Sequence, residues 1–337
     1  MATTSSNSHD HPVKVGGKSY RTGSIGHQHT VPDQFTAAEV MALRALLAAG
    51  GGGGGTVPAP NTPPPADPPT EEPSGTGVTL PVGTSQSAFL TAMANLSYDY
   101  ILLAGGDYSW NNVDWSAIDR TSNPLLIQPV AGQRVRFNYP SETYGIFRTG
   151  LSGSAKHITF DGRVADGFLF DGITVGQAGI LALFGSDHLT FRNITVRNMK
   201  RGPASDQPYK SWVAYIAAPY GRNNDHLTLD RFTLLAPAVN RAVSGFQVAS
   251  SGSHGEITIS NVTMTGYDYG FYGGQPISDL TLDDWAISDT GEAGVSIRTT
   301  AVSINGSYSN LVATGGSGGL LNQSTGSFVD GGGNVGL

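Results

Sequence analysis

The sequence predicts an all-β chain whose largest part is a right-handed parallel β-helix. One strand motif recurs six times between residues 157 and 304. A second motif, a glycine followed by apolar residues, fills the intervals between its copies. Neither strand can bury its apolar side alone, whereas stacked turns of chain bury it, and this is the organisation of a solenoid.

The first motif is represented by "DHLTFRNITV" from Asp187. In every copy two large apolar residues flank one hydroxyl residue. Because successive side chains of a strand point to opposite faces, the apolar pair is predicted to face inward and the hydroxyl outward. The expected outward column is Thr159, Thr190, Thr228, Thr258, Thr281 and Ser303, and the expected inward pairs are Ile158/Phe160, Leu189/Phe191, Leu227/Leu229, Ile257/Ile259, Leu280/Leu282 and Val302/Ile304.

The second motif places at least two short strands in every period, because even the shortest interval, from Leu280 to Val302, contains one copy. In the longest interval "WVAYI" at 212 takes its place. A shortest period of 22 residues, with several strands per turn, fits a right-handed parallel β-helix. Its copies are "GIFR" at 145, "GILA" at 179, "GFQV" at 245, "GFYG" at 270, "GVSI" at 294 and "GLLN" at 319.

The remaining sequence predicts three parts. Residues 1–50 form an N-terminal arm with a short helix over 36–50, which is marginal alone and therefore needs a partner, either another copy or another protein. Residues 51–75 are a Gly/Pro-rich linker, and 76–337 are the β-helix domain. Near the start of that domain, "TSQSAFLTAMANL" predicts an amphipathic helix with Phe89, Met93 and Leu96 on one side.

Composition restricts the classes of partner. The 337 residues carry a net charge of −7, which disfavours nucleic acid and anionic membranes as partners. The chain has no cysteine, and no apolar run long enough to span a bilayer. The N-terminus lacks the apolar segment of a signal peptide. We therefore expect a protein made in the cytoplasm that reaches the exterior on a particle.

Residues 76–337 resemble the pectate-lyase-like parallel β-helix superfamily. "HLTFRNITV" and "EITISNVTM" resemble its coil motif, and the helix near residue 89 followed by "YDYILLAGGDY" resembles its N-terminal cap and first strand. That superfamily includes polysaccharide lyases, glycoside hydrolases, phage tailspikes and proteins that only bind.

The layout of anchor, spacer and β-helix resembles phage tailspikes and gene-transfer-agent head spikes. This second resemblance implies a homotrimer on a virion or virus-like particle, attached to a capsid or tail protein through residues 1–50. It implies that the β-helix binds cell-surface polysaccharide. The alternative is a capsule depolymerase of the same fold, either a lyase or a glycoside hydrolase.

The longest interval between repeats is rich in aromatic and basic residues. Aromatic rings stack on sugars, and Arg or Lys binds acidic sugars. The alternative is a loop that packs its own aromatics against the coil below. The candidate saccharide-binding residues are Tyr209, Lys210, Trp212, Tyr215, Tyr220 and Arg222, together with Tyr267, Tyr269 and Tyr272 two coils later.

Two columns of titratable residues are weaker candidates for a catalytic site. The column His157, His188 and His226, preceded by Asp187 and Asp225, suits general acid–base work, although it also fits a ladder of turn residues. Lyases of the superfamily also need a basic residue, and the resemblance therefore adds Lys200 and Arg201. The catalytic candidates are Asp187, His188, Lys200 and Arg201. The other candidate is the column Asp161, Asp230 and Asp283, which is interrupted by Arg192 and Ser260, so no two of its carboxylates stand on adjacent coils.

Two His-x-His pairs stand in the N-terminal arm. In a trimer each pair supplies imidazoles to one transition metal, since imidazole suits iron, nickel and zinc. The alternative is a polar arm without metal. The predicted ligands are His9, His11, His27 and His29.

Overall fold

The computed structural model describes residues 12–15, 18–21, 72–139, 142–143, 145–149, 153–176, 179–201, 211–218, 221–236, 243–249, 252–288, 293–297, 303–314, 320–322 and 325–336. The chain divides into two compact units, Met1–Ala66 and Asp67–Leu337. The predicted domain boundaries at residues 50 and 75 stay predictions. The predicted helix over 36–50 and all four histidines of the His-x-His pairs lie outside the described residues.

In the first unit, β1 (Pro12–Val15) and β2 (Lys18–Arg21) pair antiparallel. The polar sequence of residues 1–35 predicts irregular chain here instead. The strands flank Gly16-Gly17, and a two-glycine loop is a hairpin signal that outweighs the polar composition of the arm.

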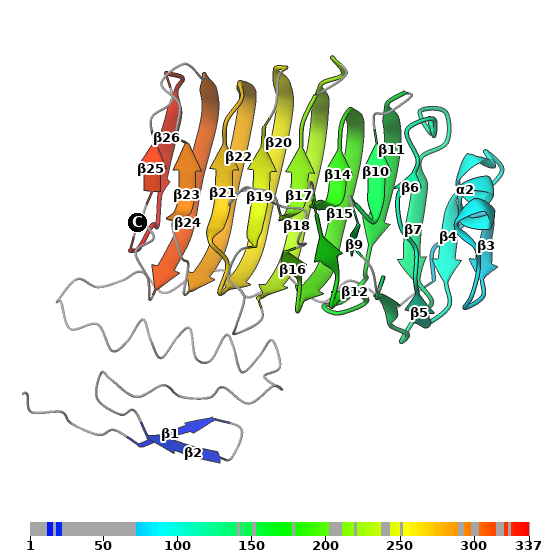
Figure 1. Ribbon diagram of the computed structural model, residues 1–337, viewed down its shortest axis with the longest axis horizontal. Helices are drawn as coiled ribbons and strands as arrows, with labels where there is room; N and C mark the ends of the chain where they lie inside the picture. Colours follow the sequence, from blue (N-terminus) through cyan, green and yellow to red (C-terminus); the bar gives the residue numbers. More distant parts are fainter. Residues whose placement is uncertain are drawn as a thin grey trace, which may run out of the picture. The chain divides into compact units, whose positions relative to one another are not determined.

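The second unit is a parallel β-helix, as predicted (Figure 1). Its turns stack so that each strand pairs in parallel with the corresponding strand of the next turn. The larger sheet comprises β3 (Gly77–Leu80), β4 (Tyr100–Leu103), β7 (Leu125–Pro129), β11 (Ala155–Asp161), β15 (Ser186–Arg197), β18 (Asn224–Leu235), β20 (His254–Thr265), β22 (Ile277–Ser288), β24 (Ile304–Thr314) and β26 (Phe328–Gly332), with β5 (Gly106–Tyr108), β8 (Val135–Phe137) and β12 (Phe168–Asp171) joined through β15.

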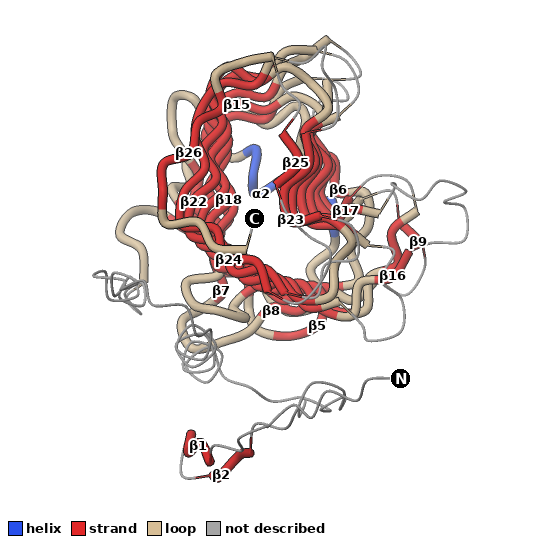
Figure 2. Tube along the Cα trace, turned by 90° about the vertical axis from the view of Figure 1, so that its left-hand side faces the viewer, coloured by secondary structure: helices blue, strands red, loops and turns tan. Residues whose placement is uncertain are grey.

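A smaller sheet lies opposite, and the two enclose one elongated interior (Figure 2). A three-stranded sheet of β9 (Glu142–Thr143), β13 (Thr174–Val175) and β16 (Lys200–Arg201) lies beside it. The smaller sheet comprises β6 (Val113–Asp114), β10 (Phe147–Thr149), β14 (Gly179–Leu183), β17 (Trp212–Ile216), β19 (Ser244–Val248), β21 (Tyr269–Gly273), β23 (Ala293–Ile297) and β25 (Leu320–Asn322). These strands contain or directly follow the starts of the glycine-led motif and include "WVAYI", which confirms the second repeat.

The strand register confirms the threonine column. Thr159, Thr190, Thr228, Thr258 and Thr281 pair in sequence on five adjacent coils, and each is partly exposed. The predicted inward pairs of these five coils are buried. Burial of large apolar side chains stabilises by about 2 kcal/mol each, so these pairs form the main core of the solenoid.

The sixth copy was placed wrongly. Leu280 pairs with Gly306, Thr281 with Ser307 and Leu282 with Tyr308, so Ser307 takes the position predicted for Ser303. A register shift separates this stretch from the Ile277–Ile304 pair. Gly306 has a φ of 126°, and its backbone approaches Leu280 so closely that a side chain has no room. Because Gly306 occupies an inward position without an apolar side chain, the pattern of apolar pairs does not detect this copy of the repeat.

Each long strand of the larger sheet, from β15 to β24, bends near its middle at a residue with positive φ. These residues form a column on adjacent coils: Asn193, Arg231, Asn261, Asp284 and Asn310. Asparagine and aspartate tolerate this conformation better than most residues, which explains why they dominate the column. The bend lets one strand contribute apolar residues to two sides of the interior.

The residue before the bend is an aspartate on alternate coils. Asp230 Oδ1 accepts hydrogen bonds from Ser260 Oγ at 2.9 Å and Asn261 Nδ2 at 2.7 Å. Asp283 Oδ1 accepts from Ser309 and Asn310 of the next coil in the same way. Asp161 accepts from Asn193 and Gln128 and forms an ion pair with Arg192. These carboxylates are therefore engaged by neighbouring coils, and the column is a structural ladder.

The N-terminal end is covered by α2 (Gln86–Ala94), whose first turn is capped by Ser85. Phe89 and Met93 are buried as predicted, but Leu96 lies beyond the end of the helix and is 52% exposed. The buried guanidinium of Arg120 donates to the carbonyl oxygens of Met93 and Asn95, at the C-terminal end of the helix. It also donates to the carbonyl of Tyr98, so one side chain ties the cap to the first coils.

Candidate functional site

The outer face of the smaller sheet carries a column of polar and aromatic side chains. Tyr215 on β17, Gln247 on β19 and Tyr272 on β21 pair in register. The two tyrosines are partly exposed, and they lie two coils apart, roughly 10 Å. Gln247 lies between them, and its Oε1 finds no hydrogen-bond partner within the part of the chain that the structure describes. We call these three residues the tyrosine face.

A layer of buried aromatics supports the tyrosine face. The Trp212 ring lies 6.0 Å from that of Tyr272 and 6.3 Å from that of Tyr269. Tyr269 packs edge-on against Tyr272, with ring centroids 5.8 Å apart. Phe184 packs edge-on against Tyr215 at 6.0 Å. These contacts hold the two exposed rings in fixed orientations, which lowers the entropy lost when a ligand binds.

Three predicted saccharide contacts are wrong. Trp212 is 0% exposed, Tyr267 is fully buried and Tyr269 is buried, so none offers a ring face to a ligand. Tyr267 belongs to the main apolar core, where burial raises the pKa of its hydroxyl well above the ordinary range. Trp212 and Tyr269 act beneath the surface, as packing partners of the exposed rings.

The other predicted contacts lie in different places. Arg222 packs beside Gly185, between the end of β14 and the start of β15. Tyr209, Lys210 and Tyr220 lie outside the described residues. A role for these four side chains in saccharide binding stays a prediction.

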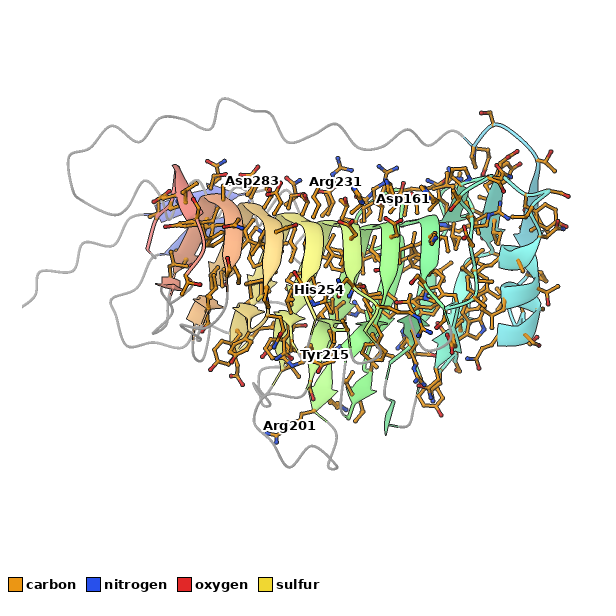
Figure 3. The ribbon with its side chains drawn as sticks, turned by 90° about the horizontal axis from the view of Figure 1, so that it is seen from above. Asp161, Arg201, Tyr215, Arg231, His254 and Asp283 are labelled. Carbon is orange, nitrogen blue, oxygen red and sulfur yellow. The ribbon has the colours of Figure 1, made fainter. Side chains whose placement is uncertain are left out.

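The catalytic candidates lie on two different sheets. Lys200 and Arg201 form β16, which pairs with β13 through Thr174 and Val175. Figure 3 shows Arg201 on the same side of the solenoid as Tyr215, opposite the bend residue Arg231 and the carboxylates Asp161 and Asp283. Asp187 and His188 lie near the start of β15 in the larger sheet. The four residues therefore do not share one strand or one sheet.

The predicted histidine column exists. The ring of His188 stacks between those of His157 and His226, with centroids 4.4 and 4.1 Å away. Asp187 Oδ1 lies 2.6 Å from His188 Nδ1. A carboxylate that orients an imidazole is a common arrangement for a general base. Use of the pair in catalysis stays a prediction.

A hollow of about 390 Å³ lies between the turns 131–134 and 162–167. Arg134 at its edge forms an ion pair with Asp166 at 3.1 Å. Arg163 is bound by Glu72 at 2.7 Å. These internal ion pairs satisfy charges at the hollow, which therefore points to no ligand.

Comparisons with known proteins place no activity on the chain. No protein-family model matches it, and no characterised protein is significantly similar to it in sequence. The chain is similar to a solved structure of the catalytic domain of a GH87 alpha-1,3-glucanase variant in complex with tetrasaccharides, with 11% identity, a TM-score of 0.20, and 81% of this chain and 71% of that one covered. Among the described residues, no helix is long and apolar enough to cross a membrane.

Proposed function

We propose that this chain binds polysaccharide through the tyrosine face on its smaller sheet. The observation that carries the proposal is the pair of partly exposed rings, Tyr215 and Tyr272, set on alternate coils over a buried aromatic layer. Two rings roughly 10 Å apart along one line suit an extended chain of sugars better than a compact ligand. Gln247 between them is buried, with 8% of its surface exposed, so the two rings supply the contacts of the proposed site.

Basic residues near the tyrosine face favour an acidic polysaccharide. Arg148 lies on the same outward column, paired in register with Ala182, which pairs with Tyr215. Lys200 is exposed, and Arg201 lies on the same side of the molecule as Tyr215 (Figure 3). Arginine and lysine bind carboxylates of acidic sugars through charge-assisted hydrogen bonds. Binding should therefore weaken as the salt concentration rises.

We further propose that the protein is a spike of a phage or gene-transfer agent, with residues 1–50 attached to a capsid or tail protein. The order of arm, Gly/Pro-rich linker and β-helix supports this proposal. A homotrimer would present three tyrosine faces to one surface, which raises avidity without new contacts.

Binding of the full chain to purified capsular polysaccharide tests the function. Tyr215→Ala and Tyr272→Ala should each weaken binding about fivefold, because one stacking contact is worth on the order of 1 kcal/mol. Tyr100→Ala is the control, since Tyr100 is partly exposed but lies on β4 of the larger sheet. Unchanged binding by both face variants would refute the tyrosine face.

The same incubation distinguishes binding from cleavage. Shortened or unsaturated sugar products that disappear with Asp187→Asn or His188→Ala would establish the depolymerase alternative. A binding protein leaves the polysaccharide intact in every variant.

A further inference from the structure

The histidine column has three unusual backbone positions and lies beside a cluster of side chains that can act as metal ligands. His157, His188 and His226 have φ values of 55°, 54° and 46°. A positive φ is uncommon for a residue with a side chain and carries strain, which often marks functional positions. Each of these residues is skipped by the strand pairing near the start of its strand, and its imidazole is at least partly exposed.

The three histidines lie beside two carboxylates on adjacent coils. Asp187 and Asp225 pair in register on β15 and β18. Like charges directly opposite each other destabilise a sheet. Lys156, on the preceding coil, forms an ion pair with Asp119 at 3.6 Å. Among the described residues, the ion-pair partners of Asp187 and Asp225 are the histidines alone. A bound cation would therefore reduce the repulsion between the carboxylates of Asp187 and Asp225.

The separations of three donor atoms fit one metal ion. His226 Nδ1 lies 3.3 Å from Asp187 Oδ1 and 3.5 Å from Asp225 Oδ2. Ligands held at about 2.0–2.1 Å by one tetrahedral ion lie about 3.3 Å from each other. The third pair, the two carboxylates, also has donor atoms within 4.8 Å of each other.

Neighbouring groups orient these donors. Asp225 Oδ1 accepts backbone N–H bonds from His226 at 3.0 Å and Glu256 at 2.9 Å, which leaves Oδ2 turned toward His226 Nδ1. His188 Nδ1 holds Asp187 Oδ1 at 2.6 Å. Hydrogen bonds that fix a ligand carboxylate are a usual part of protein metal sites.

We infer that Asp187, Asp225 and His226 bind a divalent transition metal, with His188 as a positioning residue that holds Asp187. One imidazole and two carboxylates suit zinc or cobalt, and three protein ligands leave a fourth position open. This site is separate from the tyrosine face, and from the His-x-His pairs predicted to bind metal in the N-terminal arm.

The experiment titrates the full chain with cobalt and measures the visible absorption of the bound cobalt, which reports tetrahedral coordination. Competition with zinc then measures the affinity for zinc. His9, His11, His27 and His29 are first replaced by alanine, so that metal on the arm does not obscure the result. This parent should bind one ion per chain. Asp187→Asn, Asp225→Asn and His226→Asn should each weaken binding by about tenfold or more, and His188→Ala by about tenfold. Circular dichroism checks that these exposed substitutions leave the fold intact.

Asp279→Asn is the matched control, because it removes the same charge from an exposed side chain on a nearby coil. Its metal affinity should equal that of the parent. The inference fails if the parent binds no ion, or if Asp279→Asn weakens binding as much as Asp187→Asn does. It also fails if His157→Asn abolishes binding while His226→Asn does not, since the ion would then lie one coil earlier.

Discussion

A buried histidine should make the β-helix sensitive to mild acid. His254 on β20 is 1% exposed and pairs in register with Ile277. Its Nδ1 accepts a hydrogen bond from the backbone N–H of Asn224 at 3.3 Å. Its Nε2 is buried without a partner among the described residues. Burial lowers the pKa of His254 from 6.5 to about 4, so the folded chain keeps this imidazole neutral.

The sign of the effect follows from proton uptake. Between pH 6.5 and about 4 the unfolded chain binds a proton at His254 that the folded chain does not. The free energy of unfolding therefore falls as the pH falls. Each unit of pKa difference corresponds to about 1.4 kcal/mol, so the full loss is about 3 kcal/mol. This loss of unfolding free energy is complete only below the pKa of His254 in the folded chain, and most of it has already occurred at pH 4.5.

Urea unfolding at pH 7.5 and pH 4.5, followed by tryptophan fluorescence, measures this loss. His254→Asn keeps an acceptor for Asn224 but cannot titrate, so its loss between the two pH values should be smaller by about 2.5 kcal/mol. His226→Asn is the control, because His226 is exposed. An equal acid sensitivity of wild type and His254→Asn would refute the assignment of this step to His254.

Two further substitutions test what holds the solenoid together. Arg120→Ala should lower the free energy of unfolding by about 3 kcal/mol, because buried carbonyl oxygens at the end of α2 lose their donor; a stability equal to wild type in urea unfolding would contradict the role of this side chain. Gly270→Ala should destabilise the chain and lower its melting temperature, because the added Cβ would lie 2.2 Å from the carbonyl oxygen of Gly294 on the next coil. Gly172→Ala is its control, since a Cβ there meets open space, although its positive φ of 69° adds a smaller strain.

The repeat pattern of the sequence predicted most of the fold. Alternation of apolar and hydroxyl residues predicted both the inward pairs and the outward threonine column, because each coil uses the same register. It failed at the sixth copy, where Gly306 occupies an inward position without a side chain. It also placed Leu96 in the cap, although α2 ends two residues earlier, at Ala94. The end of a helix depends on tertiary contacts with residues far away in the sequence. Here the partner is Arg120, which binds the carbonyl oxygens of Met93 and Asn95.

The tyrosine face was harder to predict because aromatic composition does not distinguish a packed ring from an exposed one. Trp212 and Tyr215 stand three residues apart on one strand, yet the first is buried and the second is partly exposed. The sequence carries no signal for the unpartnered oxygen of Gln247, which depends on its neighbours in space. The histidine column was visible as a repeat, but the convergence of Asp187, Asp225 and His226 required the three-dimensional register.

The alternation of carboxylates along the bend sets a rule for how such a protein can change length. Gln128, Asp161, Arg192, Asp230, Ser260, Asp283 and Ser309 follow one another on successive coils, so every acceptor has donors on the coils beside it. Duplication or deletion of one coil would bring two aspartates, or two donors, side by side. Duplication of two coils would preserve the pairing. Engineered versions of this part of the solenoid should therefore be lengthened or shortened by a pair of coils at a time.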